Sequence, residues 1–310
     1  MQIIVPNYYK EFRCIADKCQ HSCCIGWEID IDEDSLARFD ALSGPYGDIL
    51  RTRIDHSGET PHYRLSAGER CPFLQPNGLC EMILKLGEDA LCQICADHPR
   101  FRNHFSHRVE LGIGLCCEAA AALILKREAP MTLEVWEDDG IDGTPDGEED
   151  ALLSFRDMLL SILQDRTLPL DERFRELLDT CGTALPEGGP ARWADTLLEL
   201  ERLDEAWTDR LNTLKTPVPA PPGQNITTAL EQAAVYFLLR HLPAALEDSD
   251  VASKAAFAVF SAEILRSLCA RIPNATLDDL VELARMYSSE IEYSEDNLWT
   301  LFDWLKQDFS

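Results

Sequence analysis

The sequence predicts a mainly α protein in which an irregular, cysteine-rich N-terminal module, residues 1–130, is followed by an acidic, all-α helical domain, residues 131–310. Two observations predict this division. Ten of the twelve cysteines lie within the first 117 residues, where Gly, Pro and His interrupt every apolar run. Beyond a Gly/Asp/Pro-rich loop at residues 137–147, which we take as the domain boundary, helical periodicity dominates.

The N-terminal module contains few regular elements. Alternation of apolar and acidic residues from Trp27 to Asp32 predicts a short strand. Asp32 or Asp34 then opens a helix that runs through Leu42. At the end of the module, the uninterrupted Ala/Leu-rich run at residues 118–127 predicts a second helix.

The C-terminal domain is predicted to be helical throughout. Thr227 and Thr276, each followed by an acidic residue, are candidate N-caps of two of its helices. The proline-rich residues 216–223 form a stiff connector. The predicted helices cover residues 151–164, 170–180, 193–214, 227–246, 250–271, 277–288 and 297–309.

Net charge restricts the partners that the chain can bind. The formal charge is −27, and residues 131–310, with 14 basic and 36 acidic side chains, carry −22 of it. Such a field repels nucleic acid and attracts cationic partners, including lysine-bearing proteins, although an acidic helical surface also serves solubility alone. No apolar run is long enough for a membrane span, so we expect no membrane association.

The clustered cysteines allow three interpretations. A disulfide framework needs an oxidising compartment, but the N-terminus lacks the pattern of a secretory signal, so we expect a cytoplasmic protein with reduced thiols. Burial as small hydrophobic residues suits the isolated Cys181 and Cys269. For the bunched cysteines, metal or iron–sulfur ligation is favoured, because soft thiolates select zinc or iron–sulfur assemblies.

Cysteine spacing narrows the class of centre. The C-x4-C-x3-C-C run from Cys14 to Cys24 departs from the C-x3-C-x2-C pattern of radical enzymes, because Gly26 stands where a third thiol is required. Only Cys92 and Cys95 have the C-x2-C spacing of a zinc finger, which leaves no finger array.

The block from Cys71 to Cys80 is more specific. Pro72 stiffens the chain beside a candidate ligand, and Gly78 permits the tight turn that returns it to the second thiol. Farther on, Cys116 stands at the start of a predicted helix, where the exposed amides favour a thiolate.

Taken together, these motifs resemble the flagellin lysine-N-methylase family and the wider group of zinc- or iron-chelating cysteine-cluster proteins. The resemblance rests on FRC-x4-C-x3-CC-x-GW, CPFL-x3-GLC, C-x3-PR and a Cys-Glu-Ala-Ala element within the first 130 residues. It implies an iron–sulfur cluster, most simply 4Fe-4S, with S-adenosylmethionine as methyl donor and lysine on flagellin as acceptor. The metal ligands that it implies are Cys14, Cys19, Cys23, Cys24, Cys71, Cys80, Cys95 and Cys116.

Two features depart from the family pattern. Cys117 stands where the family has proline, so it could replace or supplement Cys116, and Cys92 is additional to the pattern. Eight matching thiols exceed the four that one cluster needs, so the ligand set stays open. His21 and His98 lie among the cysteines and could also ligate, or could have structural roles.

The implied reaction needs a neutral lysine amine, since the ordinary pKa of about 10.4 leaves it protonated at neutral pH. Glu118 is the candidate proton acceptor, and its alternative role is to complement a helix N-terminus. Arg100 could bind the carboxylate of S-adenosylmethionine or lie at the surface. No G-x-G-x-x-G follows a strand, so a Rossmann site is not supported.

The leading hypothesis is thus a protein-lysine N-methyltransferase that uses S-adenosylmethionine and an iron–sulfur cluster. The alternative is a non-enzymatic module in which zinc or a cluster only holds a loop-rich fold together. An electron carrier is less favoured, because it would not need the long helical domain.

Overall fold

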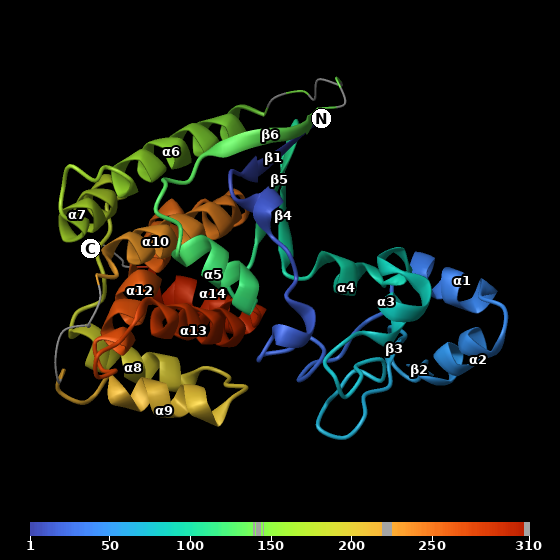
Figure 1. Ribbon diagram of the computed structural model, residues 1–310. Coiled ribbons are helices and arrows are strands. Elements are labelled where there is room, and N and C mark those ends of the chain that lie inside the picture. The colour runs from blue at the N-terminus through green and yellow to red at the C-terminus, as the bar shows by residue number, and fades with distance from the viewer. Residues whose placement is uncertain (139, 141–143, 145, 219–224, 307–310) are drawn as a thin grey trace. The chain divides into compact units, whose positions relative to one another are not determined.

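The computed structural model describes residues 1–138, 140, 144, 146–218 and 225–306, and is shown in Figure 1. It divides into two compact units. The cysteine-rich unit is Arg13–Phe101, and the helical unit combines Met1–Phe12 with Arg102–Ser310. This division differs from the predicted one at residue 130. The loop at 137–147, the connector at 216–223 and the end of the last predicted helix lie partly outside the described residues.

A four-stranded sheet explains why the first residues belong to the helical unit. Its order is β4 (Arg100–His104), β5 (Arg108–Ile113), β1 (Gln2–Pro6) and β6 (Leu133–Asp138). β1 pairs in parallel with β5 and antiparallel with β6. The prediction of an all-α domain after residue 130 is therefore wrong, because β6 is a strand. Its short alternation of apolar and polar residues was not recognised as a strand because the segment is acidic and largely exposed, and pairing with the buried end of β1 decides its conformation.

The protein is nevertheless mainly α, as predicted. Within the described ranges no helix is both long and apolar enough to cross a bilayer. The cysteine-rich unit contains α1 (Glu33–Ala41), α2 (Pro45–Thr52), α3 (Glu81–Leu86) and α4 (Gln93–Asp97). The helical unit contains α5 (Glu118–Leu125), α6 (Gly147–Leu163), α7 (Leu170–Thr180), α8 (Gly189–Glu199), α9 (Glu205–Thr213), α10 (Thr227–His241), α11 (Ala245–Asp248), α12 (Val251–Cys269), α13 (Leu277–Tyr287) and α14 (Glu295–Leu305).

Helices α10 and α12 form the centre of the helical unit, with the other helices packed around them (Figure 1). Both are apolar on almost every side, as expected for helices buried all round. Edge-on aromatic contacts join them to each other and to α13: the centroid of the Phe237 ring on α10 lies 5.8 Å from that of Phe257 on α12 and 5.5 Å from that of Tyr287 on α13.

Two predicted helices are interrupted. Residues 193–214 form α8 and α9, because Asp204 caps a new helix by accepting a hydrogen bond from the Ala206 amide at 2.8 Å. α10 ends at His241, since Pro243 lacks the amide that would continue it. The Thr276 cap is confirmed, with a reciprocal Thr276–Asp279 capping box, whereas Thr227 is the first helical residue and not the cap.

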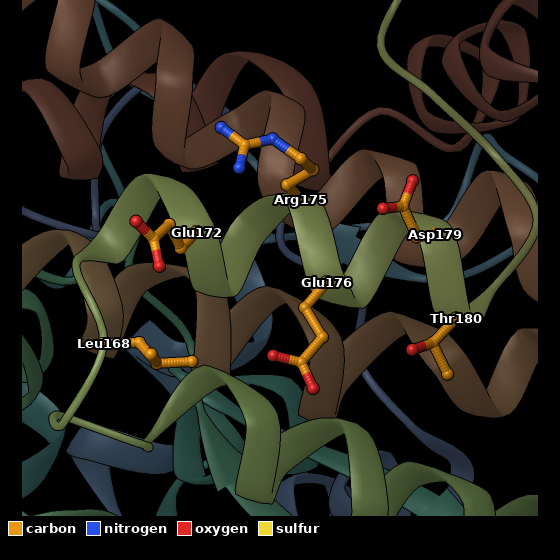
Figure 2. Close-up of a pocket in the computed structure, with 6 residues that line it drawn as sticks. All are labelled: Leu168, Glu172, Arg175, Glu176, Asp179 and Thr180. Carbon is orange, nitrogen blue, oxygen red and sulfur yellow. The ribbon is translucent and has the colours of Figure 1, made fainter.

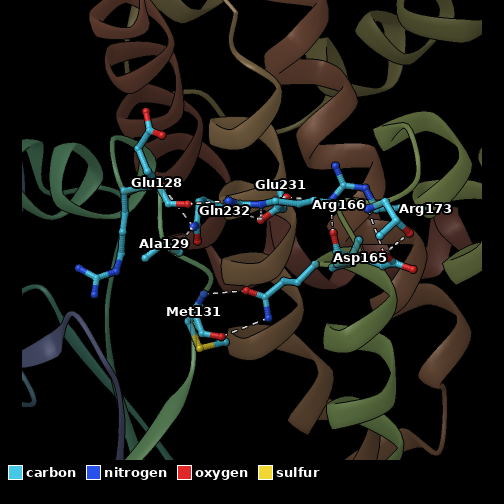
Figure 3. A network of polar contacts seen from close by, with 12 residues as sticks. Glu128, Ala129, Met131, Asp165, Arg166, Arg173, Glu231 and Gln232 are labelled. Carbon is cyan, nitrogen blue, oxygen red and sulfur yellow. Dashed lines mark hydrogen bonds and ion pairs between the residues drawn. The ribbon is translucent and has the colours of Figure 1, made fainter.

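A buried network of charges joins α10 to its neighbours (Figure 3). Glu231, 1% exposed, accepts hydrogen bonds from Arg166 at 2.8 Å and from Arg173 at 2.7 Å. Beside it, Gln232 donates to the Ala129 carbonyl at 2.8 Å. The network fixes the segment after α5 and the helices α6 and α7 against the central helix.

The cysteine-rich unit has a small core of its own. Ile29, Ile31, Phe39, Tyr63 and Phe73 are almost fully buried there. Its regular sheet is the two-residue pair β2 (Ile54–Asp55) and β3 (His62–Tyr63). The strand predicted at residues 27–32 is reduced to an isolated bridge with β3, while α1 begins after its Asp32 cap as predicted.

Candidate metal centre

Backbone pairing brings Cys24 and Cys71 together. The Cys71 amide donates to the Cys24 carbonyl at 2.8 Å, and Ile25 forms an antiparallel bridge with Arg70. Two cysteines that are 47 positions apart in the sequence thus leave neighbouring strands of chain.

The loop from Cys71 to Cys80 closes on itself. Leu74 and Cys80 form an antiparallel bridge, and the Gly78 amide donates to the Gln75 carbonyl at 3.0 Å. Gly78 has a φ of +81°, and a Cβ there would lie 3.3 Å from the Asp17 Cα. The glycine turn predicted from the sequence is therefore present, and it returns Cys80 to the core as the N-cap of α3.

Cys92 and Cys95 enter the same core from α4. Cys92 is the N-cap of this helix, and its thiol is hydrogen-bonded to that of Cys95. The Asp32 carboxylate, at the start of α1, accepts a hydrogen bond from the Gln93 amide at 2.8 Å. This contact fixes the start of α4 against α1.

Five cysteines therefore share one core. Cys71 and Cys92 are buried members of it, and three half-buried cysteines pack against it. The five are Cys24, Cys71, Cys80, Cys92 and Cys95. Cys92, which the family pattern did not include and whose role the sequence left open, belongs to this set.

Burial is the largest influence on the pKa of Cys71 and Cys80, whereas at the other three core thiols it is a hydrogen bond with a neighbouring cysteine. Burial raises the pKa of Cys71 to about 12, with contributions in the same direction from Cys24, Cys80 and Cys92. Hydrogen bonding acts the other way at Cys24, whose pKa the Cys23 thiol lowers to about 7. A bound metal cation would supply the positive charge that stabilises thiolates in this buried core. Because the thiols must lose their protons to become ligands, metal binding would release protons.

Two tyrosines that the sequence did not single out approach the thiols. The Tyr63 hydroxyl donates to the Met82 sulfur at 3.3 Å and is hydrogen-bonded to Cys92. The Tyr46 hydroxyl is buried, its ring packs against the same core as Cys80, and within the described residues the hydroxyl has no hydrogen-bond partner. A buried hydroxyl in that position is suited to donate to sulfur of a bound centre.

The remaining predicted ligands lie elsewhere. Cys14 and Cys23 are exposed and Cys19 is half-exposed. None of these three is among the described residues packed against the cysteine core, although the Cys23 thiol contacts Cys24. Cys116 belongs to the other unit.

Cys116 has a polar environment of its own in the helical unit. Burial raises the pKa of its thiol to about 12, while a hydrogen bond with Tyr293 and the charge of Arg240 act in the opposite direction. The neighbouring Leu115 amide donates to the Tyr236 hydroxyl at 3.2 Å, and that hydroxyl contacts the buried Glu292 carboxylate at 3.0 Å.

The two other predicted site residues have defined positions. Glu118 is the first residue of α5, directly after Cys117, which is the N-cap. Arg100 begins β4, and its guanidinium donates to the Ala96 carbonyl at 3.2 Å. Because they lie in different units, the structure does not relate Glu118 to Arg100.

Two open hollows flank α7, and none of the predicted site residues lines either of them. Figure 2 shows the first, whose lining side chains project from α7 and from Leu168 in the loop before it. Glu172, Glu176 and Asp179 make it acidic. The second has an apolar wall that includes Phe174 and Trp193. Neither contains a cysteine among its lining residues.

Comparison with known proteins supports the resemblance in part of the chain. The chain is 26% identical over 136 residues to the lysine-N-methylases of Salmonella typhimurium and Salmonella choleraesuis, a match that covers 41% of this chain and 33% of each relative. The flagellar biosynthetic protein FliU of Salmonella muenchen is 27% identical over 136 residues, which is 79% of its length. No family model and no solved structure matches.

The match thus spans about a third of the length of the curated lysine-N-methylases. The resemblance to lysine-N-methylases that the cysteine motifs predicted is confirmed by these relatives.

Proposed function

We propose that this chain is a protein-lysine N-methyltransferase that uses S-adenosylmethionine and holds an iron–sulfur cluster. The observation that carries the proposal is the convergence of five cysteines, from three separate stretches of sequence, in the core of the cysteine-rich unit. The names of the relatives support the reaction, since two of them are lysine-N-methylases.

The donor set fits a cluster better than a single zinc ion. Zn–S bonds of about 2.3 Å place tetrahedral sulfurs about 3.8 Å apart, whereas iron and sulfide ions between the thiolates of a cluster hold them farther apart. We compared this spacing with sets of three or more His, Cys, Asp or Glu side chains whose ligand atoms all lie within 4.8 Å of one another. Among the described residues, no such set contains a cysteine. Because no three of the described thiols meet that limit, we favour the cluster over a single zinc ion in this proposal.

We propose that four of the five core cysteines hold this cluster, a choice that adds Cys92 to the candidates and leaves out the exposed Cys14. A cluster there would supply one-electron chemistry and a Lewis-acidic iron. Tyr46 and Tyr63 would donate hydrogen bonds toward sulfur and so orient the ligands.

For methyl transfer, the lysine Nζ lone pair forms a bond to the methyl carbon of the sulfonium as the carbon–sulfur bond breaks. The bonding electrons stay on sulfur, and S-adenosylhomocysteine leaves. The amine must first lose a proton, and we assign this step to the Glu118 carboxylate, which lies half-buried at the start of α5. We assign Arg100 to the carboxylate of the methyl donor.

As substrate we propose flagellin or another lysine-bearing protein. The relative FliU is named as a flagellar biosynthetic protein. The net charge of −27 also favours a cationic segment over nucleic acid as a partner.

Labelled S-adenosylmethionine and flagellin, incubated with anaerobically purified protein, test the reaction. We expect label on flagellin lysines and its loss in Glu118→Gln, with Glu128→Gln as a matched exposed control. A cluster-loaded preparation that transfers no label would contradict the proposed reaction.

The alternative, a non-enzymatic metal-binding module, is favoured by one observation. The thiols are themselves part of the small core of the cysteine-rich unit, so a metal there would stabilise its fold whether or not catalysis occurs. Such a module would bind its metal and leave flagellin unlabelled, and a zinc form would be colourless where a cluster is brown.

A further inference from the structure

A second set of metal-binding side chains lies in the cysteine-rich unit, outside the five thiols. Glu28, Asp30 and His62 each offer one donor atom, and these atoms all lie within 4.8 Å of one another. Carboxylate oxygen and imidazole nitrogen are harder ligands than thiolate, so the set differs in kind from the cysteine core.

Backbone pairing positions this set. The Ile31 amide donates to the Pro61 carbonyl at 2.8 Å, and the Tyr63 amide donates to the Ile29 carbonyl at 3.0 Å. Asp30 and His62 face each other across an isolated antiparallel bridge between these two hydrogen bonds.

Alternation then sends the three side chains to one side. Ile29, Ile31 and Tyr63 are each 1% exposed and point into the core. Because side chains alternate along extended chain, Glu28 and Asp30 lie together on the opposite side, next to His62. Two carboxylates are thus held close together, with one imidazole as the nitrogen donor.

The contacts of the two ring nitrogens of His62 place its Nε2 opposite a second acceptor. Its Nδ1 lies 3.1 Å from the Thr60 carbonyl oxygen, which can only accept, so Nδ1 carries the hydrogen. In neutral imidazole Nε2 is then an acceptor, yet it lies 3.4 Å from Oε2 of Glu28, another acceptor. Two facing lone pairs are favourable only with a cation between them, either a proton or a metal ion.

We propose that Glu28, Asp30 and His62 bind a divalent first-row transition cation, such as Mn²⁺ or Zn²⁺, through two carboxylates and Nε2 of the imidazole. The Nδ1 contact with the Thr60 carbonyl is the arrangement that orients a metal-binding histidine. Three protein ligands leave positions for water, as in zinc sites that are not closed. The site is independent of the proposed methyl transfer.

Mn²⁺ is the probe, since thiolates bind it weakly and free Mn²⁺ is measured directly by its electron paramagnetic resonance signal. The full-length protein, purified anaerobically and treated with a mild chelator, is titrated with Mn²⁺. We expect one Mn²⁺ per chain, and an affinity about tenfold or more weaker in His62→Gln and in Asp30→Asn. Iron content should be the same in all variants.

Matched controls change the same residue types elsewhere in the unit. His56→Gln and Asp34→Asn, both at exposed positions, should leave Mn²⁺ affinity within about twofold of the parent. Glu28→Gln, whose side chain is 62% exposed, is the variant least able to disturb folding and should also weaken binding.

The proposal is overturned if the parent protein binds no stoichiometric Mn²⁺, or if the site variants and the controls bind equally. Either result would mean that a proton lies between His62 and Glu28, and that the group is an ordinary surface ion pair. Methyl transfer plays no part in this readout, so its absence would not affect the outcome.

Discussion

Glu231 illustrates how single residues are constrained in the helical unit. Its carboxylate is 1% exposed and is matched by Arg173, 3% exposed, and by Arg166. The arginines hold α10 against α6 and α7 through this one side chain (Figure 3). Removing one member of such a group leaves a buried charge without its partner.

Glu231→Gln is therefore expected to lower the free energy of unfolding by about 3–5 kcal/mol. Chemical denaturation monitored by circular dichroism measures this. Asp171→Asn, which breaks an exposed pair with Arg266, is the control and should cost at most about 1 kcal/mol. Similar decreases in the free energy of unfolding in the two variants would contradict a larger contribution from the buried charge group.

His241 gives a residue-scale prediction for pH. Burial lowers the pKa of its imidazole, outweighing the hydrogen bond with Glu292. At Glu292 burial acts to raise the pKa, but Arg240 and His241 outweigh it, so the pKa is lowered. Unfolding restores the ordinary pKa values of both groups. As the pH falls, the unfolded state therefore binds more protons at these two groups than the folded state does.

Stability should consequently decline as the pH falls below about 6.5, the ordinary pKa of histidine, and decline further through the acid range where carboxylates titrate. Replacing His241 by Gln should reduce the fall in the free energy of unfolding between pH 7 and 5. A remaining slope is expected from His98, whose pKa burial lowers to about 4. Equal slopes in parent and variant, from denaturation at a series of pH values, would contradict this.

At the scale of elements, helix ends were the features most directly readable from the sequence. Thr276 caps the helix that it was predicted to open, and of the two candidates Asp32 and Asp34 it is Asp32 that caps α1, because a side-chain oxygen next to a free amide is a local interaction. Thr227 failed as a cap since Asn225 accepts the hydrogen bond from its amide at 2.9 Å. Strand β6 was missed because its partner, β1, is more than 120 residues away.

Thr276→Ala should lower the free energy of unfolding by about 1 kcal/mol, because it removes the acceptor of the Asp279 amide and half of the capping box. Thr227→Ala serves as the matched control. It lies exposed in the first turn and should be neutral within about 0.5 kcal/mol. A thermal or urea denaturation series that ranks the two variants in the opposite order would contradict the assignment of the cap.

At the scale of the whole molecule, the sequence predicted that cysteines come together, but not which of them do so. The bunching of cysteines predicted a thiol site, and five of them do meet in one core. Membership of the site was not predictable from spacing alone. Cys92 enters through the packing of α4 against α1, and Cys116 belongs to the unit that β1 ties to the chain's later residues. Both outcomes depend on tertiary contacts between distant segments.

Iron and acid-labile sulfide, determined on the same anaerobically purified protein, test the central claim most directly. We predict about four of each per chain, lost in Cys71→Ser and Cys92→Ser but retained in Cys14→Ser and Cys181→Ser. Parent protein with neither iron nor sulfide, or core variants that keep both, would contradict a cluster held by the converging thiols.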